Sequence, residues 1–199
     1  MAILRSFIFL DQLQPQTMCY LGSWIRGSLP RSNMAAQVIE VAPGLDIEAL
    51  TDVALKAADV QAGILVVERQ FGYLEIHSRD VAAVKAAAEA VLDAMGMTAD
   101  KAMRPKILAS KVVTRIDPNH AFLINRNKGG SMILGGETLF VLETEPAAYA
   151  ILAANAAEKA ATIKIVDYRM IGATGRLYLS GTESEVRAAA TAAQAALGV

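Results

Sequence analysis

The chain has 199 residues, 54% hydrophobic and 20% charged, and its 19 basic and 20 acidic side chains leave a net charge of −1. This length accommodates two domains of ordinary size. The balanced charge gives no indication of a nucleic-acid-binding protein, which needs a clustered basic surface. The sequence has no apolar run of the roughly 18 residues that a membrane span requires. The single cysteine, Cys19, cannot form an internal disulfide, so a reducing cytoplasm is the expected compartment.

The first half of the chain predicts strands separated by two long helices. Apolar stretches predict strands over residues 6–10, near 18–25, and over 37–41, 63–67 and 73–76. The first helix follows Asp46, the expected N-cap, and carries its apolar residues on one face. The second helix begins at the N-cap Asp80 and stops at Gly96.

The second half of the chain repeats this order. Its patterns predict strands over 107–113, near 121–125 and over 139–142, then a helix with Pro146 in its first turn and two more strands. A capping box of Thr182 and Glu185 opens the final helix.

The repeat indicates a tandem duplication of one small domain. Three pairs of residues match at an offset of 102 positions, namely Val84 with Val186, Ser78 with Ser180 and Ala58 with Ala160. We expect domains over 1–97 and 105–199, joined by a linker at 98–104. The predicted fold class is α+β, with about five mostly antiparallel strands and two main helices in each copy.

The sequence contains no motif that indicates an enzyme, a metal site or a cofactor. His77 and His120 fall at unrelated places in the two copies, and Cys19 is expected in an apolar strand without a basic partner. The glycines at 172–175 precede a strand, so they do not form the helix N-terminus of a dinucleotide-binding fold. We therefore expect no catalytic residues, no bound metal and no cofactor.

Four segments resemble the domain of bacterial microcompartment (BMC) shell proteins. The segments LKAADV (55–60) and EKAATI (158–163) are similar to the family's helix ending Val-Lys-Ala-Ala-Asn-Val. The segment VDYRMIG (166–172) resembles its Tyr-x-Lys-Ile-Gly entry to the pore loop, and DVAAVKAA (80–87) resembles its second helix start. Here the strand pair that follows the second helix in the common form comes first, as in the circularly permuted tandem members.

This resemblance implies a structural tile rather than an enzyme. The permuted tandem proteins form homotrimers that mimic a hexamer, so the chain is expected to build a pseudohexamer with a central, gated pore for small metabolites. The expected partners are other shell proteins, both hexamers and pentamers, and the expected location is the microcompartment shell in the cytoplasm. The low charged fraction fits a chain that buries its flanks against copies of itself.

The resemblance places pore residues in one loop of each copy. In copy one they are Glu68, Arg69, Gln70, Phe71 and Gly72. In copy two they are Tyr168, Arg169, Met170, Ile171 and Gly172. Family members close the pore by reorienting an adjacent Glu and Arg, which Glu68 and Arg69 would supply; the alternative is an ordinary exposed hairpin with a weak ion pair. The loop of copy two is longer and has no neighbouring Glu.

Two lysines occupy matching helix ends in the two copies. The resemblance places Lys56 and Lys159 at the edges of the tile, against the same lysine of the next tile. The alternative is a solvated lysine near a helix C-terminus, which the helix dipole favours, and the two interpretations are compatible. Trp24 is either a packed strand end or a subunit-interface anchor. The rival function is an oligomeric, small-molecule-binding regulatory module of ferredoxin-like type, with contact loops at 129–130 or 172–175.

Overall fold

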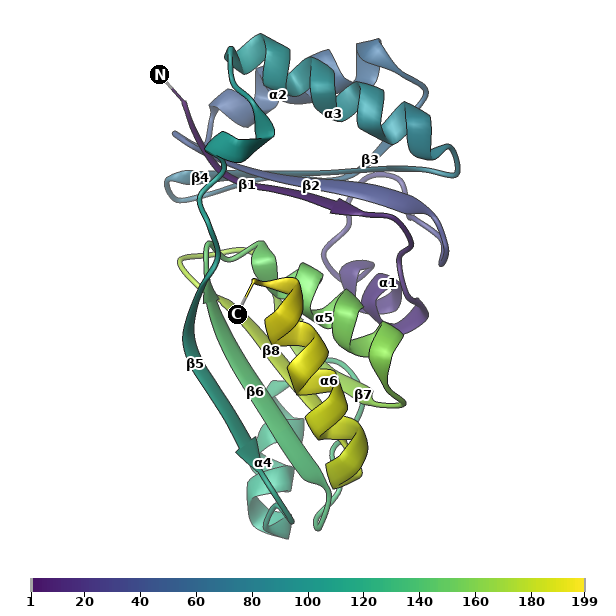
Figure 1. Cartoon of the computed structure of the whole chain (residues 1–199), viewed down its shortest axis with the longest axis vertical. Coiled ribbons are helices and arrows are strands. Elements are labelled where there is room, and N and C mark those ends of the chain that lie inside the picture. Colours follow the sequence, from purple (N-terminus) through teal and green to yellow (C-terminus); the bar gives the residue numbers. More distant parts are fainter. Residues whose placement is uncertain (1, 199) are drawn as a thin grey trace. The chain divides into compact units, whose positions relative to one another are not determined.

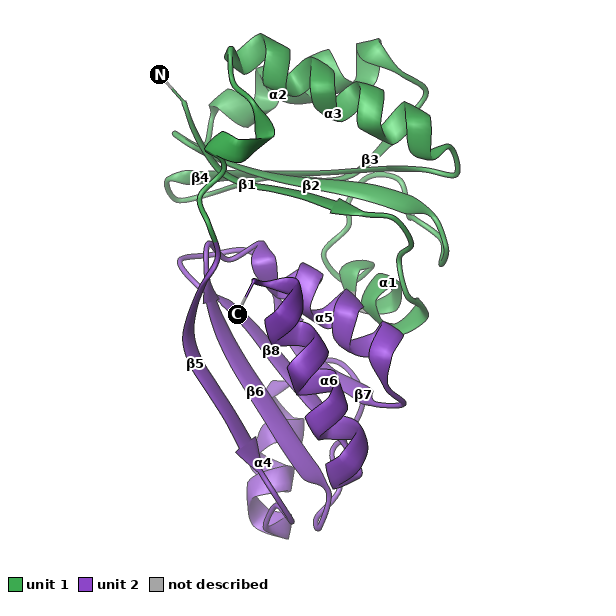
Figure 2. Cartoon of the chain, viewed as in Figure 1, with its two compact units in different colours: residues 1–104 green, residues 105–199 purple. Residues whose placement is uncertain are grey.

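The computed structural model describes residues 2–198, with only the backbone for Tyr20, and it divides the chain into two compact units (Figures 1 and 2). The first unit ends at Arg104 and the second begins at Pro105. The first contains β1 (Ile3–Leu10), α1 (Pro15–Leu21), β2 (Ala35–Ala42), α2 (Asp46–Ala57), β3 (Gln61–Glu68), β4 (Phe71–Ser78), α3 (Val81–Met95) and a 3₁₀ turn, η1 (Ala99–Lys101). The second contains β5 (Lys106–Val113), α4 (Pro118–Asn127), β6 (Thr138–Glu145), α5 (Tyr149–Ala160), β7 (Lys164–Arg169), β8 (Gly175–Gly181) and α6 (Glu183–Ala196).

The two units have the same topology, which confirms the duplication. Each holds one antiparallel sheet, in the order β1-β2-β4-β3 or β5-β6-β8-β7. The strands match at an offset of 103, because Ala35 pairs with Ser78 as Thr138 pairs with Gly181. The offset falls to 102 only at the last helix. Ser180 therefore corresponds to His77 rather than to Ser78. Ala160, the last residue of α5, corresponds to Ala57, the last residue of α2, rather than to Ala58. Two of the three matches expected from the sequence are thus corrected.

Each sheet buries one face under two long helices (Figure 1). In the first unit, Ile47, Leu50 and Ala54 of α2 and Val84, Ala87 and Val91 of α3 recur at helical spacing and are buried against the sheet. In the second unit, α5 contributes mostly alanines to its buried face, so its backbone approaches its neighbours closely. The predicted α+β class is confirmed.

Each sheet has four strands rather than the expected five. The segments near 18–25 and 121–125 are not strands, because α1 and α4 occupy these places. Thr17 and Leu21 of α1 are fully buried, as is Leu13 just before the helix, and the spacing of four positions is a helical period. In α4 the Asp117 carboxylate accepts the Asn119 N–H at 2.8 Å and Pro118 occupies the first turn.

The predicted helix ends are partly confirmed. Asp80 caps α3 by accepting the Ala82 N–H, and Gly96 ends this helix with a left-handed φ of 63°. Asp46 is not a cap, since it is the first residue of α2 and follows Leu45, which makes no side-chain cap bond. Pro146 also lies outside the first turn, because α5 begins at Tyr149.

Candidate functional site

The β3–β4 hairpin carries the pore residues expected in the first unit. Pairing continues to Glu68 and Phe71, so the turn consists of Arg69 and Gln70 alone, and Arg69 takes a left-handed φ of 55°. The Arg69 side chain is 90% exposed and its Nε lies 3.8 Å from Oε1 of Glu68, which is 48% exposed. An ion pair this long and this exposed stabilises little, so both side chains are free to reorient.

The base of this hairpin is held by buried contacts. The Arg5 guanidinium lies over the Phe71 ring, 3.8 Å from its centroid, and donates to Oε1 of Glu40 at 2.6 Å. A Cβ on Gly72 would lie 2.2 Å from the carbonyl oxygen of Gly44, so only glycine fits where β4 passes the start of α2. The rigid base and exposed tip leave Glu68, Arg69 and Gln70 as the side chains that can move.

The β7–β8 loop of the second unit is open over a longer stretch. Pairing stops at Arg169 and Arg176, which leaves residues 170–174 unpaired. The side chains of Tyr168 and Met170 are buried inside the unit, so among the five residues expected at the pore only Arg169, Ile171 and Gly172 reach the surface. By strand register Ile171 and Gly172 occupy the places of Glu68 and Arg69, so the second unit lacks the Glu–Arg pair.

A charged cluster that the sequence did not indicate lies beside this loop. The carboxylate of Asp167 is buried, with Lys128 Nζ 3.2 Å and Arg169 Nε 3.7 Å from its Oδ2. Burial raises the pKa of Asp167 despite these cations. Burial, together with the nearby Arg169 and Arg176, lowers the pKa of Lys128. The cluster joins residues from α4's end and two strands, which sequence spacing alone does not bring together.

Glu143 extends this cluster toward the surface. Its Oε1 accepts from the Thr174 hydroxyl at 2.7 Å and from Arg176 Nε at 3.2 Å. The Thr174 hydrogen bond and then Arg176 lower the pKa of Glu143. These bonds tie the long loop to β6, so its charged residues are less mobile than the hairpin tip of the first unit.

The two matched lysines lie at the ends of equivalent helices. Lys56 and Lys159 both stand in the last turn, of α2 and α5 respectively, and both are exposed. Lys56 Nζ donates to Oδ2 of Asp52 one turn earlier at 2.5 Å. Their shared position agrees with both readings of these residues, the edge contact and the solvated helix end.

The other residues considered in the sequence analysis do not form a functional site among the described residues. Cys19 lies on α1 rather than on a strand, and it is exposed. Trp24 follows α1 in a loop, and its buried Nε1 favours packing within the unit. Among residues 2–198 no three His, Cys, Asp or Glu side chains form a metal-binding group. Within the same range, every helix is too short or too polar to cross a bilayer.

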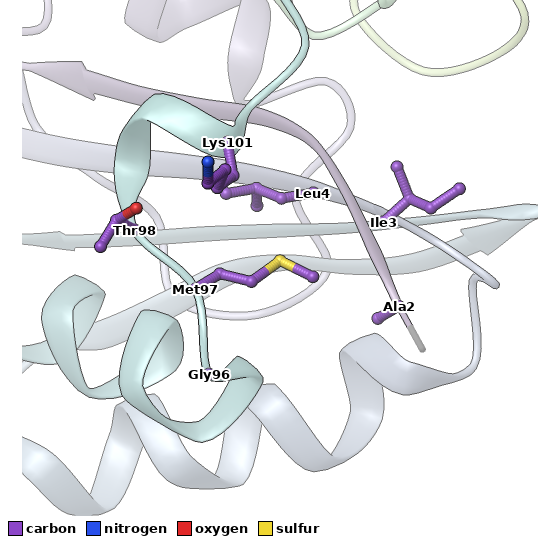
Figure 3. Close-up of a pocket in the computed structure, with 7 residues that line it drawn as sticks. All are labelled: Ala2, Ile3, Leu4, Gly96, Met97, Thr98 and Lys101. Atoms are coloured by element: carbon purple, nitrogen blue, oxygen red, sulfur yellow. The ribbon is translucent and has the colours of Figure 1, made fainter.

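A cavity of about 500 Å³ lies between the start of β1 and the segment after α3 (Figure 3). It is lined by Ala2, Ile3, Leu4, Gly96, Met97, Thr98 and Lys101. Its polar groups are already engaged, since the Thr98 hydroxyl donates to Asp100 at 2.5 Å and Lys101 Nζ lies 3.8 Å from the same carboxylate. The cavity therefore offers an apolar wall without a free polar anchor.

Comparisons with known proteins agree with this architecture. The family model described as the CsoS1D N-terminal domain matches residues 4–101, and the BMC domain model matches residues 138–199. The carboxysome shell protein CcmP of Synechococcus elongatus is 46% identical, over 98% of this chain and 91% of its own. The carboxysome shell protein CsoS1D of Prochlorococcus marinus is 46% identical, over 96% and 75%.

Two solved structures are similar over nearly their whole length. The fused permuted hexameric shell protein of the RMM microcompartment is 70% identical, with a TM-score of 0.97 over 98% of this chain and 96% of its own. The double ringed trimeric shell protein of the same microcompartment is 42% identical, with a TM-score of 0.96 over 100% and 97%.

Proposed function

The chain belongs to the bacterial microcompartment shell-protein family, in its permuted tandem form, and from this membership we propose that three copies assemble into a pseudohexameric tile with a pore at its centre. It is a structural component of a shell, and the regulatory-module alternative is set aside. The observation that carries the proposed assembly is the repeated four-stranded topology, because two equivalent units per chain let three chains fill six equivalent places.

The proposed pore is bordered by hairpins of two kinds. Three copies of the β3–β4 tip bring three Glu68 and three Arg69 side chains to the axis, and three β7–β8 loops contribute Arg169, Ile171 and Gly172. A ring of three carboxylates repels itself, as does a ring of three guanidinium groups. Adjacent opposite charges let each chain pair with its neighbour in a closed state. In an open state both groups are hydrated, so the two states differ by only a few kcal/mol.

The pore proposal is tested by replacing Glu68. Glu68→Ala removes the partner of Arg69, so the arginines repel one another and the pore should be open more often. Since the loop is exposed, folding should change little. Structures of the wild-type and variant trimers would show the side chains at the threefold axis. Glu68 and Arg69 lying away from the axis would remove the pore assignment for the first unit.

The assembly proposal is tested at two levels. Sedimentation should find a trimer at micromolar concentration; a stable monomer would contradict it.

The double variant Lys56→Ala with Lys159→Ala should still form the trimer. It should pack less well into flat layers of trimers, as seen by electron microscopy, because the edge contact between trimers is lost. Lys111→Ala, another exposed lysine on β5, is the matched control and should leave the sheets unchanged. If the double variant forms the same layers of trimers as the wild type, both lysines are solvated helix ends rather than edge contacts.

In this proposal the other shell proteins, hexamers and pentamers, are the neighbours of the tile, and small metabolites pass through its pore. The relatives named as carboxysome shell proteins and the trimeric and permuted shell structures support this role.

A further inference from the structure

A row of charged side chains crosses three strands of the second unit. Glu143 of β6 pairs with Arg176 of β8, and Arg176 pairs in turn with Arg169 of β7. The row lies on the face of the sheet that α4 covers, because Tyr178, two residues along β8 from Arg176, packs against the buried residues of α4. Arg169 and Arg176 form the last pair of the ladder, beside the open loop 170–174 (Figure 1). Two guanidinium groups therefore stand side by side with one carboxylate in their row.

The fold does not require two arginines at these positions. In the first unit the same row consists of Glu40, Tyr73 and Val66. Like charges on directly opposite residues of neighbouring strands repel each other, so the arginine pair costs free energy. The second unit carries this cost and the first avoids it. An anion held between the two guanidinium groups would offset it.

Both arginines are accessible and keep free donors. The side chains of Arg169 and Arg176 are 50% and 51% exposed. Arg176 donates through Nε to Glu143 at 3.2 Å, and Nε of Arg169 lies 3.7 Å from a carboxylate oxygen of Asp167. Because both contacts use Nε, the terminal nitrogens of each guanidinium group remain as donors. A ligand from solvent can reach them without any change in the fold.

The surrounding charges leave one cation unbalanced. Lys128 lies 3.2 Å from Asp167, so the cluster contains three cations and two carboxylates. Asp167 is only 1% exposed and contacts both Lys128 and Arg169, while Glu143 is paired with Arg176. Burial, and then the charges of Arg169 and Arg176, lower the pKa of Lys128, so the three cations act on one another. The exposed side of the cluster is therefore positive.

We propose that Arg169 and Arg176 together bind a terminal phosphate group, either of a small phosphomonoester or of free phosphate, with its oxygens bridging the two guanidinium groups. The Cβ atoms of directly opposite residues are about 4.5–5.5 Å apart, so one phosphate reaches both side chains. A terminal phosphate has three acceptor oxygens and about 1.5–2 negative charges at neutral pH. A planar carboxylate has two oxygens and is matched by a single guanidinium, so the arginine pair favours phosphate.

The site lies at the base of the loop that the proposed function places at the pore. If the pore exists, three such sites border it in each tile and favour the entry of phosphorylated metabolites. That use rests on the proposed function, whereas binding requires only the fold of the second unit. The two ideas can therefore fail separately. Phosphate binding by a trimer whose β7–β8 loops lie away from the axis would keep the site and remove its use, and loops at the axis without binding would keep the pore and remove the site.

Phosphate binding can be measured on the whole chain by isothermal titration calorimetry. Sodium phosphate is titrated at constant ionic strength set with sodium chloride, and we expect one phosphate per chain, since the first unit lacks the arginine pair. Methyl phosphate binding as tightly as phosphate would indicate a phosphomonoester as the ligand, and binding of phosphate alone would indicate the free ion. Dimethyl phosphate has two terminal oxygens and a single charge, so it should bind much more weakly.

Three variants test the arginines. Arg169→Gln and Arg176→Gln should each weaken phosphate binding about tenfold or more, since a hydrogen bond to a charged group is lost. Arg187→Gln is the matched control, because Arg187 is 57% exposed and pairs with Glu183 on α6, away from the row. It removes the same charge and should bind as the wild type does.

Several results would overturn the proposal. They are the absence of saturable binding, two sites per chain, equal binding of dimethyl phosphate, and full affinity in either Arg169→Gln or Arg176→Gln. Binding that appears only in Glu68→Ala would also overturn it, because a carboxylate of a neighbouring chain would then be the partner of the arginines.

Discussion

Replacing Arg5 by methionine should destabilise the first unit far more than the equivalent change destabilises the second. Glu40 is fully buried and the Arg5 side chain is 10% exposed, with 2.6 Å between Nε and Oε1. Removing one partner of such a buried pair takes away the cation that balances the buried carboxylate and costs about 3–5 kcal/mol. Methionine keeps an unbranched side chain at this place but loses both the ion pair with Glu40 and the guanidinium contact with the Phe71 ring.

The duplication provides the control. Glu143 occupies the place of Glu40, but its partner Arg176 is half exposed, at 3.2 Å. Arg176→Met should therefore cost only about 0–1 kcal/mol. Urea unfolding of both variants at one protein concentration measures the difference, since assembly makes stability depend on concentration. An Arg5→Met cost within about 1 kcal/mol of the control would refute the assignment of Arg5–Glu40 as a buried charge pair.

Two other changes test the packing and the electrostatics. Burial raises the pKa of Glu75, so the folded chain binds the carboxyl proton more tightly than the unfolded chain does. The free energy of unfolding should therefore fall as the pH rises above 4.5, the ordinary pKa of this carboxyl. Glu75→Gln should reduce this slope, measured by urea unfolding between pH 4.5 and 8, and leave the smaller contribution of Asp167; an unchanged slope would contradict the buried carboxyl. Gly72→Ala should cost about 1–3 kcal/mol, because its Cβ would clash with Gly44. Gly181→Ala, with neighbours at 3.6 Å or more, is the control and should melt near the wild type.

Much of the fold follows from the sequence because its signals are local. The caps at Asp80 and Gly96 and the apolar faces of α2 and α3 each lie within one segment, so periodicity and capping chemistry identify them. The sequence predicts a strand where α1 lies, because the apolar run there is short and a run of that length does not distinguish a helical period from a strand period.

The candidate site was harder to predict because it depends on register. The register of β7 is irregular between Ile165 and Asp167, and both faces of the strand are covered, so Tyr168 is buried within the unit rather than exposed beside the loop. The partners of Arg5 and Lys128 come from strands that lie far away in the sequence. Local patterns contain no information on such pairings.

Because two unequal units are fused in one chain, the order in which the units follow one another around the proposed ring is fixed. If the two units were separate chains that mixed freely in equal amounts, only about 3% of six-membered rings would alternate strictly. A single chain makes every proposed ring alternate without any recognition between unlike subunits. Residues such as Glu68 in one unit and Ile171 in the other can then diverge independently, and every tile still carries the same three of each.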